Sequence, residues 1–181
     1  GYTAAEAIFR SIDDPIAVTN SRIGLARSWI DMREFSGAES IGREILQAAR
    51  DDERNRLEAR ALILLGEIDI ARASWNEAVI DFSQALEIAE RLGDASLGFP
   101  IRANLARAWL ELGDTDTAAP LLDAITLERP EHTEVYRLQA RLAWELGDAA
   151  RAAEFMTLAR NGAGEAWNDE DQATLDRYRS Q

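Results

Sequence analysis

One pattern of residues recurs four times along the chain and constrains its fold more than any other feature. In each copy a small residue is followed twelve positions later by a second small residue. The four pairs are Ala26 with Ala38, Gly66 with Ala78, Ala106 with Ala118, and Ala140 with Ala152. Large apolar residues stand three or four positions from the small ones, so they share one side of an α-helix. The pattern predicts pairs of antiparallel helices that approach closely where two small residues meet.

The turn between the two helices of a pair carries a second signal. Gly113 and Gly147 occupy this turn in the third and fourth copies, where glycine adopts a positive φ at little cost. Arg33 and Ala73 occupy the same position in the first two copies. We therefore expect those two turns to differ, or their first helices to run longer. Successive copies are 40, 40 and 34 residues apart, and we expect the extra residues to lengthen the paired helices.

The pattern resembles the tetratricopeptide repeat, a helix-turn-helix unit with a period of about 34 residues. Besides the small pairs, the resemblance rests on Trp29, Phe82, Trp109, Gly113, Pro130 and Gly147. It covers residues 18–161. One position departs from the pattern, because Gly42 stands where the other copies have Phe82, Leu122 and Met156. The resemblance implies a groove, lined by the first helix of each unit, that binds extended or helical peptides.

The expected fold is therefore all-α, a right-handed α-solenoid of antiparallel helix pairs. We expect the pairs at about 18–50, 54–92, 99–128 and 132–161. Residues 1–14 are interpreted as a helix of a truncated preceding unit. Residues 168–181 are expected to form a capping helix with Asn168 at its N-cap, because a solenoid needs a polar terminal element.

Composition excludes several function classes. The chain has no cysteine and one histidine, which excludes thiol chemistry and paired-histidine metal sites. His132 has no accompanying motif and is interpreted as a solvated or capping residue. The net charge of −13 argues against direct nucleic-acid binding, since phosphate contacts need a basic surface. We expect no enzyme activity, no cofactor and no metal.

The sequence also lacks the roughly 18 unbroken apolar residues of a membrane-spanning helix. No membrane association is expected. The compartment is not fixed by the sequence, and a soluble, cytoplasmic location is favoured over a periplasmic one.

The residue after the first small residue of each unit is expected to face the groove implied by the resemblance. In three units it is an arginine: Arg27, Arg107 and Arg141. An acid follows each arginine by four positions: Asp31, Glu111 and Glu145. These arginines either form a ladder that grips carboxylates of a partner, or each pairs with the acid on its own helix. The second interpretation is favoured.

Four further residues are candidates for the same groove. Arg60, Asn104 and Arg137 would add hydrogen-bond donors. Trp144 either faces the groove as an aromatic anchor or packs on the adjacent helix.

The sequence thus favours a non-catalytic scaffold that binds a protein or peptide partner on the concave face. The alternative is a self-assembling or intramolecular module of a larger protein, with a homodimer formed through Ala5, Ile8 and Phe9. The arginine-rich, lysine-free composition and the C-terminal segment are similar in style to the C-terminal tetratricopeptide regions of bacterial multidomain regulators.

Overall fold

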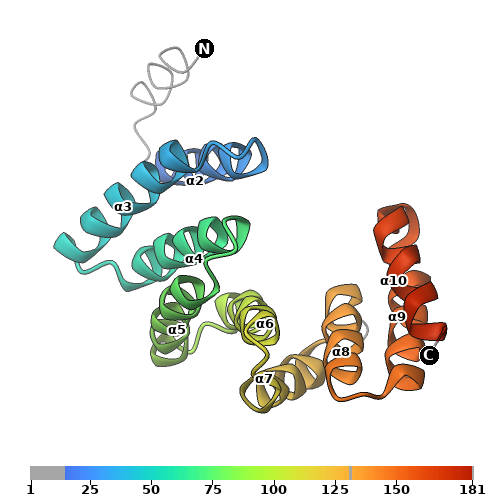
Figure 1. The fold of residues 1–181 in the computed structure, drawn as a ribbon. Coiled ribbons are helices and arrows are strands. Elements are labelled where there is room, and N and C mark those ends of the chain that lie inside the picture. The colour runs from blue at the N-terminus through green and yellow to red at the C-terminus, as the bar shows by residue number, and fades with distance from the viewer. Residues whose placement is uncertain (1–14, 131, 181) are drawn as a thin grey trace. The chain divides into compact units, whose positions relative to one another are not determined.

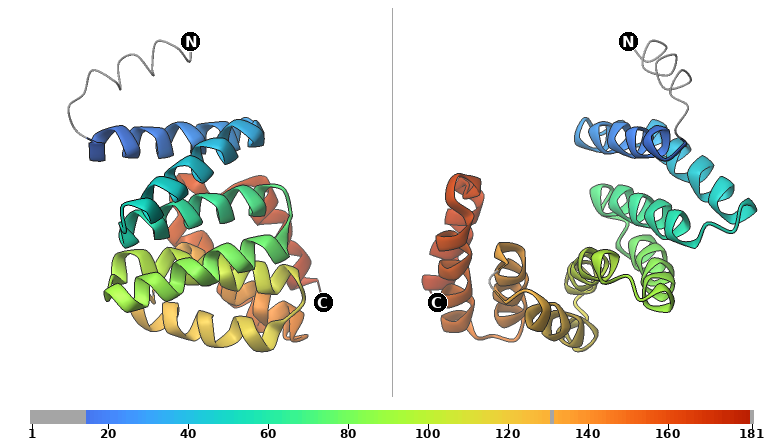
Figure 2. Two further views of the ribbon diagram at one scale, coloured as in Figure 1. Left: turned by 90° about the vertical axis from the view of Figure 1, so that its left-hand side faces the viewer. Right: turned by 180° about the vertical axis from the view of Figure 1, so that it is seen from behind.

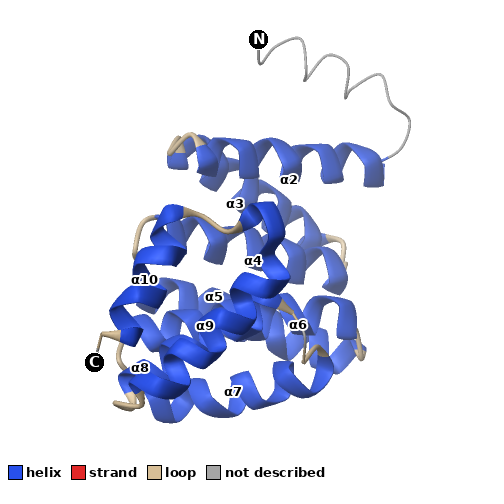
Figure 3. Cartoon of the chain, turned by 90° about the vertical axis from the view of Figure 1, so that its right-hand side faces the viewer, coloured by secondary structure: helices blue, strands red, loops and turns tan. Residues whose placement is uncertain are grey.

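The computed structural model of the chain describes residues 15–130 and 132–180. Within these ranges it contains α-helices, one short 3-10 helix and no strand (Figures 1 and 3). The α-helices are α2 (Pro15–Asp31), α3 (Phe35–Asp51), α4 (Asn55–Ala71), α5 (Trp75–Leu92), α6 (Ala95–Glu111), α7 (Thr115–Glu128), α8 (Thr133–Glu145), α9 (Ala149–Ala163) and α10 (Asp169–Arg179). The all-α prediction is confirmed. The helix expected at residues 1–14, with the apolar residues proposed for self-assembly, lies outside the described residues.

The helices fall into two compact units, and the boundary between the units in the sequence follows Gly93. Unit 1 contains α2 to α5, and unit 2 contains α6 to α10. Inside each unit every helix packs on the next one in the sequence, so that helix pairs follow one another (Figure 2). This is the pairing of an α-solenoid, as the repeated small residues predict.

The small residues lie at the closest approaches between helices. Ala26, Ala38 and Ala78 are fully buried. A Cβ atom placed on Gly66 of α4 would lie 2.8 Å from two ring atoms of Phe82 on α5. Any larger residue at this position therefore collides with an aromatic ring that has no room to move.

Gly42 departs from the repeat pattern for a similar reason. A Cβ atom on Gly42 would lie 2.8 Å from Cδ2 of Leu65, which belongs to α4. The Leu65 side chain thus occupies the space that a large residue on the second helix fills in the other units.

The turns within the four helix pairs share one geometry, so the expectation that two of them differ is wrong. Arg33 and Ala73 have φ values of 62° and 58°, beside 79° and 80° for Gly113 and Gly147. In each turn the next backbone N–H reaches back five residues, as from Ser74 to the carbonyl of Asp69 at 2.8 Å. These turn hydrogen bonds and the helix packing hold Arg33 and Ala73 in a conformation that glycine adopts more easily.

The positive φ of Ala73 leads to a prediction for the stability of the chain. Replacing it with glycine (Ala73→Gly) should raise the free energy of unfolding by about 0.5–1 kcal/mol, because the left-handed conformation costs an alanine more than glycine loses in chain entropy. The control is Ala48→Gly on the exposed side of α3, which should lower stability by about 1 kcal/mol. Urea unfolding followed by circular dichroism measures both. A destabilised Ala73→Gly chain would contradict the turn geometry.

The third helix pair begins earlier than the sequence predicts. Helix α6 starts at Ala95 rather than near residue 99, so Pro100 lies inside the helix. The Asp94 side chain accepts a hydrogen bond from the N–H of Ser96 at 3.1 Å and so caps this early start. Gly93, at a φ of 63°, ends the preceding helix one residue before the cap.

Candidate functional site

In unit 1 the expected groove residues lie on α2 and α4. We call the side of these helices that carries Arg27, Arg60 and Glu67 the first-helix face. Arg27 donates from Nε and Nη2 to the Glu67 carboxylate at 2.9 and 3.0 Å. This two-point pairing joins neighbouring first helices and fixes the guanidinium plane. Arg27 therefore pairs across helices and not with Asp31 on its own helix.

Arg60 differs from Arg27 because no carboxylate of the described residues pairs with it. Burial lowers the pKa of Arg60, and the positive charges of Arg27 and Arg56 lower it further. An arginine stays protonated at physiological pH even so. The first-helix face of unit 1 thus holds a half-buried positive charge that lacks a counter-ion in this part of the protein.

In unit 2 the arginines of α8 and α6 are also paired across helices. Arg107 on α6 donates to Glu134 on α8. Arg137 donates two hydrogen bonds to Asp171 on α10, at 3.1 and 2.7 Å. Both arginines therefore connect a helix to the second helix after it, α6 to α8 and α8 to α10, and have their charge neutralised.

Arg141 is the one groove arginine that binds the acids proposed from the sequence. It donates from Nε to Glu145 on its own helix at 2.7 Å and from Nη1 to Glu111 on α6 at 3.2 Å. The favoured interpretation, that each arginine pairs with the acid on its own helix, is therefore correct for Arg141 alone and wrong for Arg27 and Arg107, which pair with acids on other helices. A partner protein must compete with an internal carboxylate to reach Arg27, Arg107, Arg137 or Arg141.

Trp144 packs on α10, the helix expected from the sequence at residues 168–181. Its ring stacks on Tyr178 of α10, with centroids 4.7 Å apart and planes 27° apart. Tyr178 and Leu175 are buried in the same apolar cluster. Asn104, on α6, is half-buried.

The only histidine in the sequence caps the start of a helix. His132 is the N-cap of α8, where its Nδ1 accepts a hydrogen bond from the N–H of Glu134 at 3.3 Å. Its ring also meets Phe99 edge-on at 5.0 Å. At the start of α10, Asn168 and Asp171 form a reciprocal capping box, which accounts for the acidic residues there. The described residues contain no group of three or more acids and histidines able to hold a metal ion.

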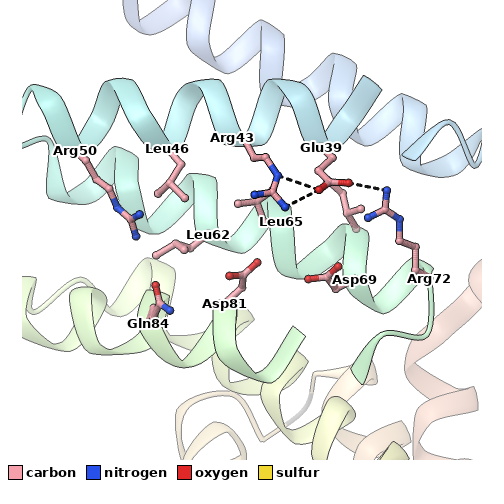
Figure 4. Close-up of a pocket in the computed structure, with 11 residues that line it drawn as sticks. Glu39, Arg43, Leu46, Arg50, Leu62, Leu65, Asp69, Arg72, Asp81 and Gln84 are labelled. Carbon is pink, nitrogen blue, oxygen red and sulfur yellow. Dashed lines mark hydrogen bonds and ion pairs between the residues drawn. The ribbon is translucent and has the colours of Figure 1, made fainter. Parts of the chain in front are cut away.

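A second feature of unit 1, which the sequence did not indicate, is a cavity of about 240 Å³ among α3, α4 and α5 (Figure 4). Its apolar lining includes Leu46, Leu62 and Leu65. Its polar lining has three acids and three arginines: Glu39, Asp69, Asp81, Arg43, Arg50 and Arg72. On α4 two cavity residues, Leu62 and Asp69, each follow a residue of the first-helix face, Arg60 or Glu67, by two positions. They therefore lie about 200° around the helix axis, on its other side.

The charges in this cavity are only partly paired. Glu39 accepts from Arg43 at 2.7 Å and forms an ion pair with Arg72 at 2.8 Å, and these two bonds lower the pKa of Glu39. Arg50 pairs with Glu58 at 2.8 Å. Among the described residues, neither Asp69 nor Asp81 has an ion pair or side-chain hydrogen bond. Figure 4 shows both carboxylates beside the Arg43–Glu39 pair with no bond to it.

Burial, together with the nearby Asp69 carboxylate, raises the pKa of Asp81 from 3.8 to about 6, and the charges of Arg43 and Arg50 oppose this shift. Burial also raises the pKa of Asp69. One signal in the sequence could have pointed here, since each aspartate stands directly beside a core position, Ile68 or Phe82. An acid next to a buried residue on a packed helix is expected to be partly desolvated.

Comparisons with known proteins support the repeat assignment. Two models of the tetratricopeptide repeat match the sequence, one at residues 81–142 and one at residues 134–156. No curated protein matches it. Residues 81–156 of the chain therefore contain tetratricopeptide repeats.

Solved structures extend the same fold over most of the chain. Aspartyl phosphate phosphatase F from Bacillus subtilis aligns with a TM-score of 0.73 at 15% identity, over 93% of this chain and 46% of that one. The repeats of a putative kinesin light chain from Podosopora anserina align with a TM-score of 0.70 at 20% identity, over 93% and 88%. A tetratricopeptide repeat protein from Parabacteroides merdae aligns with a TM-score of 0.59 at 23% identity, over 90% and 60%.

At these identities the neighbours establish the fold alone, and the chain spans 46% of the phosphatase. Tetratricopeptide repeats are in general protein-interaction modules, so the repeats support a protein-interaction scaffold. In the described part of the chain, no helix is both long and apolar enough to cross a membrane.

Proposed function

We propose that the chain is a non-catalytic scaffold that binds a peptide or protein partner on the concave, first-helix face. Arg60 is the anchor of this contact and binds a carboxylate of the partner. The observation that carries the proposal is that Arg60 is half-buried beside two other arginines and has no counter-ion among the described residues. A guanidinium in this position gains more from a partner's carboxylate than one already neutralised.

The paired groove arginines have a supporting role in this proposal. Glu67 holds the Arg27 guanidinium in a fixed position near Arg60, so an incoming carboxylate that binds Arg60 lies near Arg27 and competes with Glu67 for it. Arg107, Arg137 and Arg141, with Asn104, form the corresponding face of unit 2. Only an edge of the Trp144 ring can contact the partner, because a face of this ring is stacked on Tyr178.

Charge reversal at Arg60 tests the proposal. Wild-type chain and an Arg60→Glu variant are used as baits in lysate of the source organism, and captured proteins are quantified by mass spectrometry. A specific partner should be lost about tenfold or more in Arg60→Glu, since removing one charged hydrogen bond costs about 1.5–3 kcal/mol. Arg91→Glu, an equal charge change in the last turn of α5, should retain it.

Two results would contradict the proposal. Equal capture by wild type and Arg60→Glu, at equal helicity, would exclude Arg60 as the anchor. Capture of the bait chain itself, with a dimer mass by light scattering, would instead support self-assembly.

A further inference from the structure

The cavity of unit 1 has a composition suited to one kind of ligand. Its three arginines are already paired, Arg43 and Arg72 with Glu39, and Arg50 with Glu58. The groups left without an ion pair in the described structure are the carboxylates of Asp69 and Asp81. Counting Glu58, the local charges are four acids and three arginines, a net charge of −1. The cavity therefore favours a cation over an anion.

The geometry also restricts the form of that cation. A metal ion such as Ca²⁺ needs six to eight oxygen ligands. Of the three acids lining the cavity, Glu39 is held by Arg43 and Arg72, which leaves two carboxylates. The volume of about 240 Å³ is smaller than the 300–1,000 Å³ typical of sites for larger organic ligands. Leu46, Leu62 and Leu65 line the same cavity and can contact an aliphatic chain.

We propose that this cavity is a second binding site, which receives a cationic side chain, arginine or lysine, of a partner protein. The charged end binds between Asp69 and Asp81, and the methylene groups lie along Leu62 and Leu65. The site lies on the side of α4 away from the first-helix face, so it is distinct from the contact proposed for Arg60. The net charge of −13 attracts basic segments toward the chain as a whole.

The pH dependence of this binding follows from the groups that face Asp81. These are Arg43 and Arg50 on α3 and Asp69 on α4, with Gln84 in the lining from α5 itself. With a pKa of about 6, Asp81 is charged at pH 7.5 and mostly protonated at pH 5. Protonation removes one of the two carboxylates that bind the cation. Affinity should therefore fall as the pH is lowered through 6, by about tenfold.

The probes for the test are N-acetyl-arginine amide and N-acetyl-lysine amide, titrated into the isotope-labelled full chain and followed by NMR. N-acetyl-citrulline amide, an uncharged analogue of the arginine probe, is the control ligand. Saturable shifts are expected at the amides around Asp69, Asp81 and Leu62, with at least one cationic probe binding about tenfold more tightly than citrulline.

Variants complete the test. Asp81→Asn should weaken cation binding about tenfold, whereas Asp31→Asn, at an exposed position at the end of α2, should not change it. Asp81→Asn should remain folded, because a carboxylate with a raised pKa destabilises the chain when it is charged. Arg60→Glu should also bind the probes normally, which separates this site from the proposed function. Equal binding of citrulline, shifts elsewhere, or full binding by Asp81→Asn would overturn the proposal.

Discussion

Replacing Phe82 with alanine should lower the free energy of unfolding by about 3–5 kcal/mol. The Phe82 ring is fully buried and lies directly over the backbone of Gly66, at the closest approach of α4 and α5. Its removal leaves a cavity that neither helix can close without losing other contacts. Urea denaturation gives the free energy change. Ile80→Ala, on the exposed side of the same helix, should change it by less than about 0.5 kcal/mol.

A double variant tests the contact itself. Gly66→Leu alone should destabilise the chain by about 1–3 kcal/mol or more, because its Cβ atom already collides with the ring. Combined with Phe82→Ala, the new leucine enters the space that the ring has left. The double variant should therefore be more stable than the sum of the two single changes predicts, by about 1 kcal/mol or more. Strict additivity would mean that the two residues do not share this space.

The second large effect is expected in the capping helix. Leu175 is fully buried in a cluster with Ala140, Met156 and Tyr178, so Leu175→Ala should cost about 2–5 kcal/mol. Hydrogen exchange at the amides of α8 and α9 should accelerate, because α10 covers the cluster that these helices share. Leu127→Ala is the control, since 86% of Leu127 is exposed.

Equal exchange rates in wild type and Leu175→Ala would contradict this role for α10. The capping helix would then be an appendage whose contacts add little to the stability of unit 2.

The helix pairs could be predicted from sequence because their signals are local. A small residue and its large neighbours, three or four positions apart, determine which side of a helix is buried. The turns at Arg33 and Ala73 could not be predicted in this way. Their φ values of 62° and 58° are imposed by the packing of helices on both sides, which outweighs the preference of the single residue.

At the candidate site, the partners of the groove arginines could likewise not be predicted from the spacing of residues along one helix. Spacing along one helix suggested Asp31 for Arg27, but the observed partner, Glu67, is 40 positions away. Arg137 and Asp171 are 34 positions apart. Such pairs depend on which helices pack against each other and on how far one helix is shifted along the axis of the other. Four-residue spacing identifies only partners on one helix, as for Arg141 and Glu145.

The cavity was harder to predict from the sequence than the ion pairs of the groove arginines, because three helices contribute residues to it. Each of Asp69 and Asp81 stands beside a buried residue of its own helix, which indicates partial desolvation of its carboxylate but not that the two carboxylates line one cavity. Only the packing of α3 over α4 and α5 encloses them and raises the pKa of Asp81 to about 6.

The most direct test of the account is the reactivity of Arg60 toward an arginine-specific reagent, such as phenylglyoxal, in the free chain and in complex with the partner that wild type captures. Mass spectrometry quantifies modification residue by residue. We expect Arg60 to react in the free chain and to be protected about tenfold in the complex, while exposed Arg91 reacts equally in both. Equal modification of Arg60 in the free chain and the complex would contradict the claim that the first-helix face of unit 1 binds the partner.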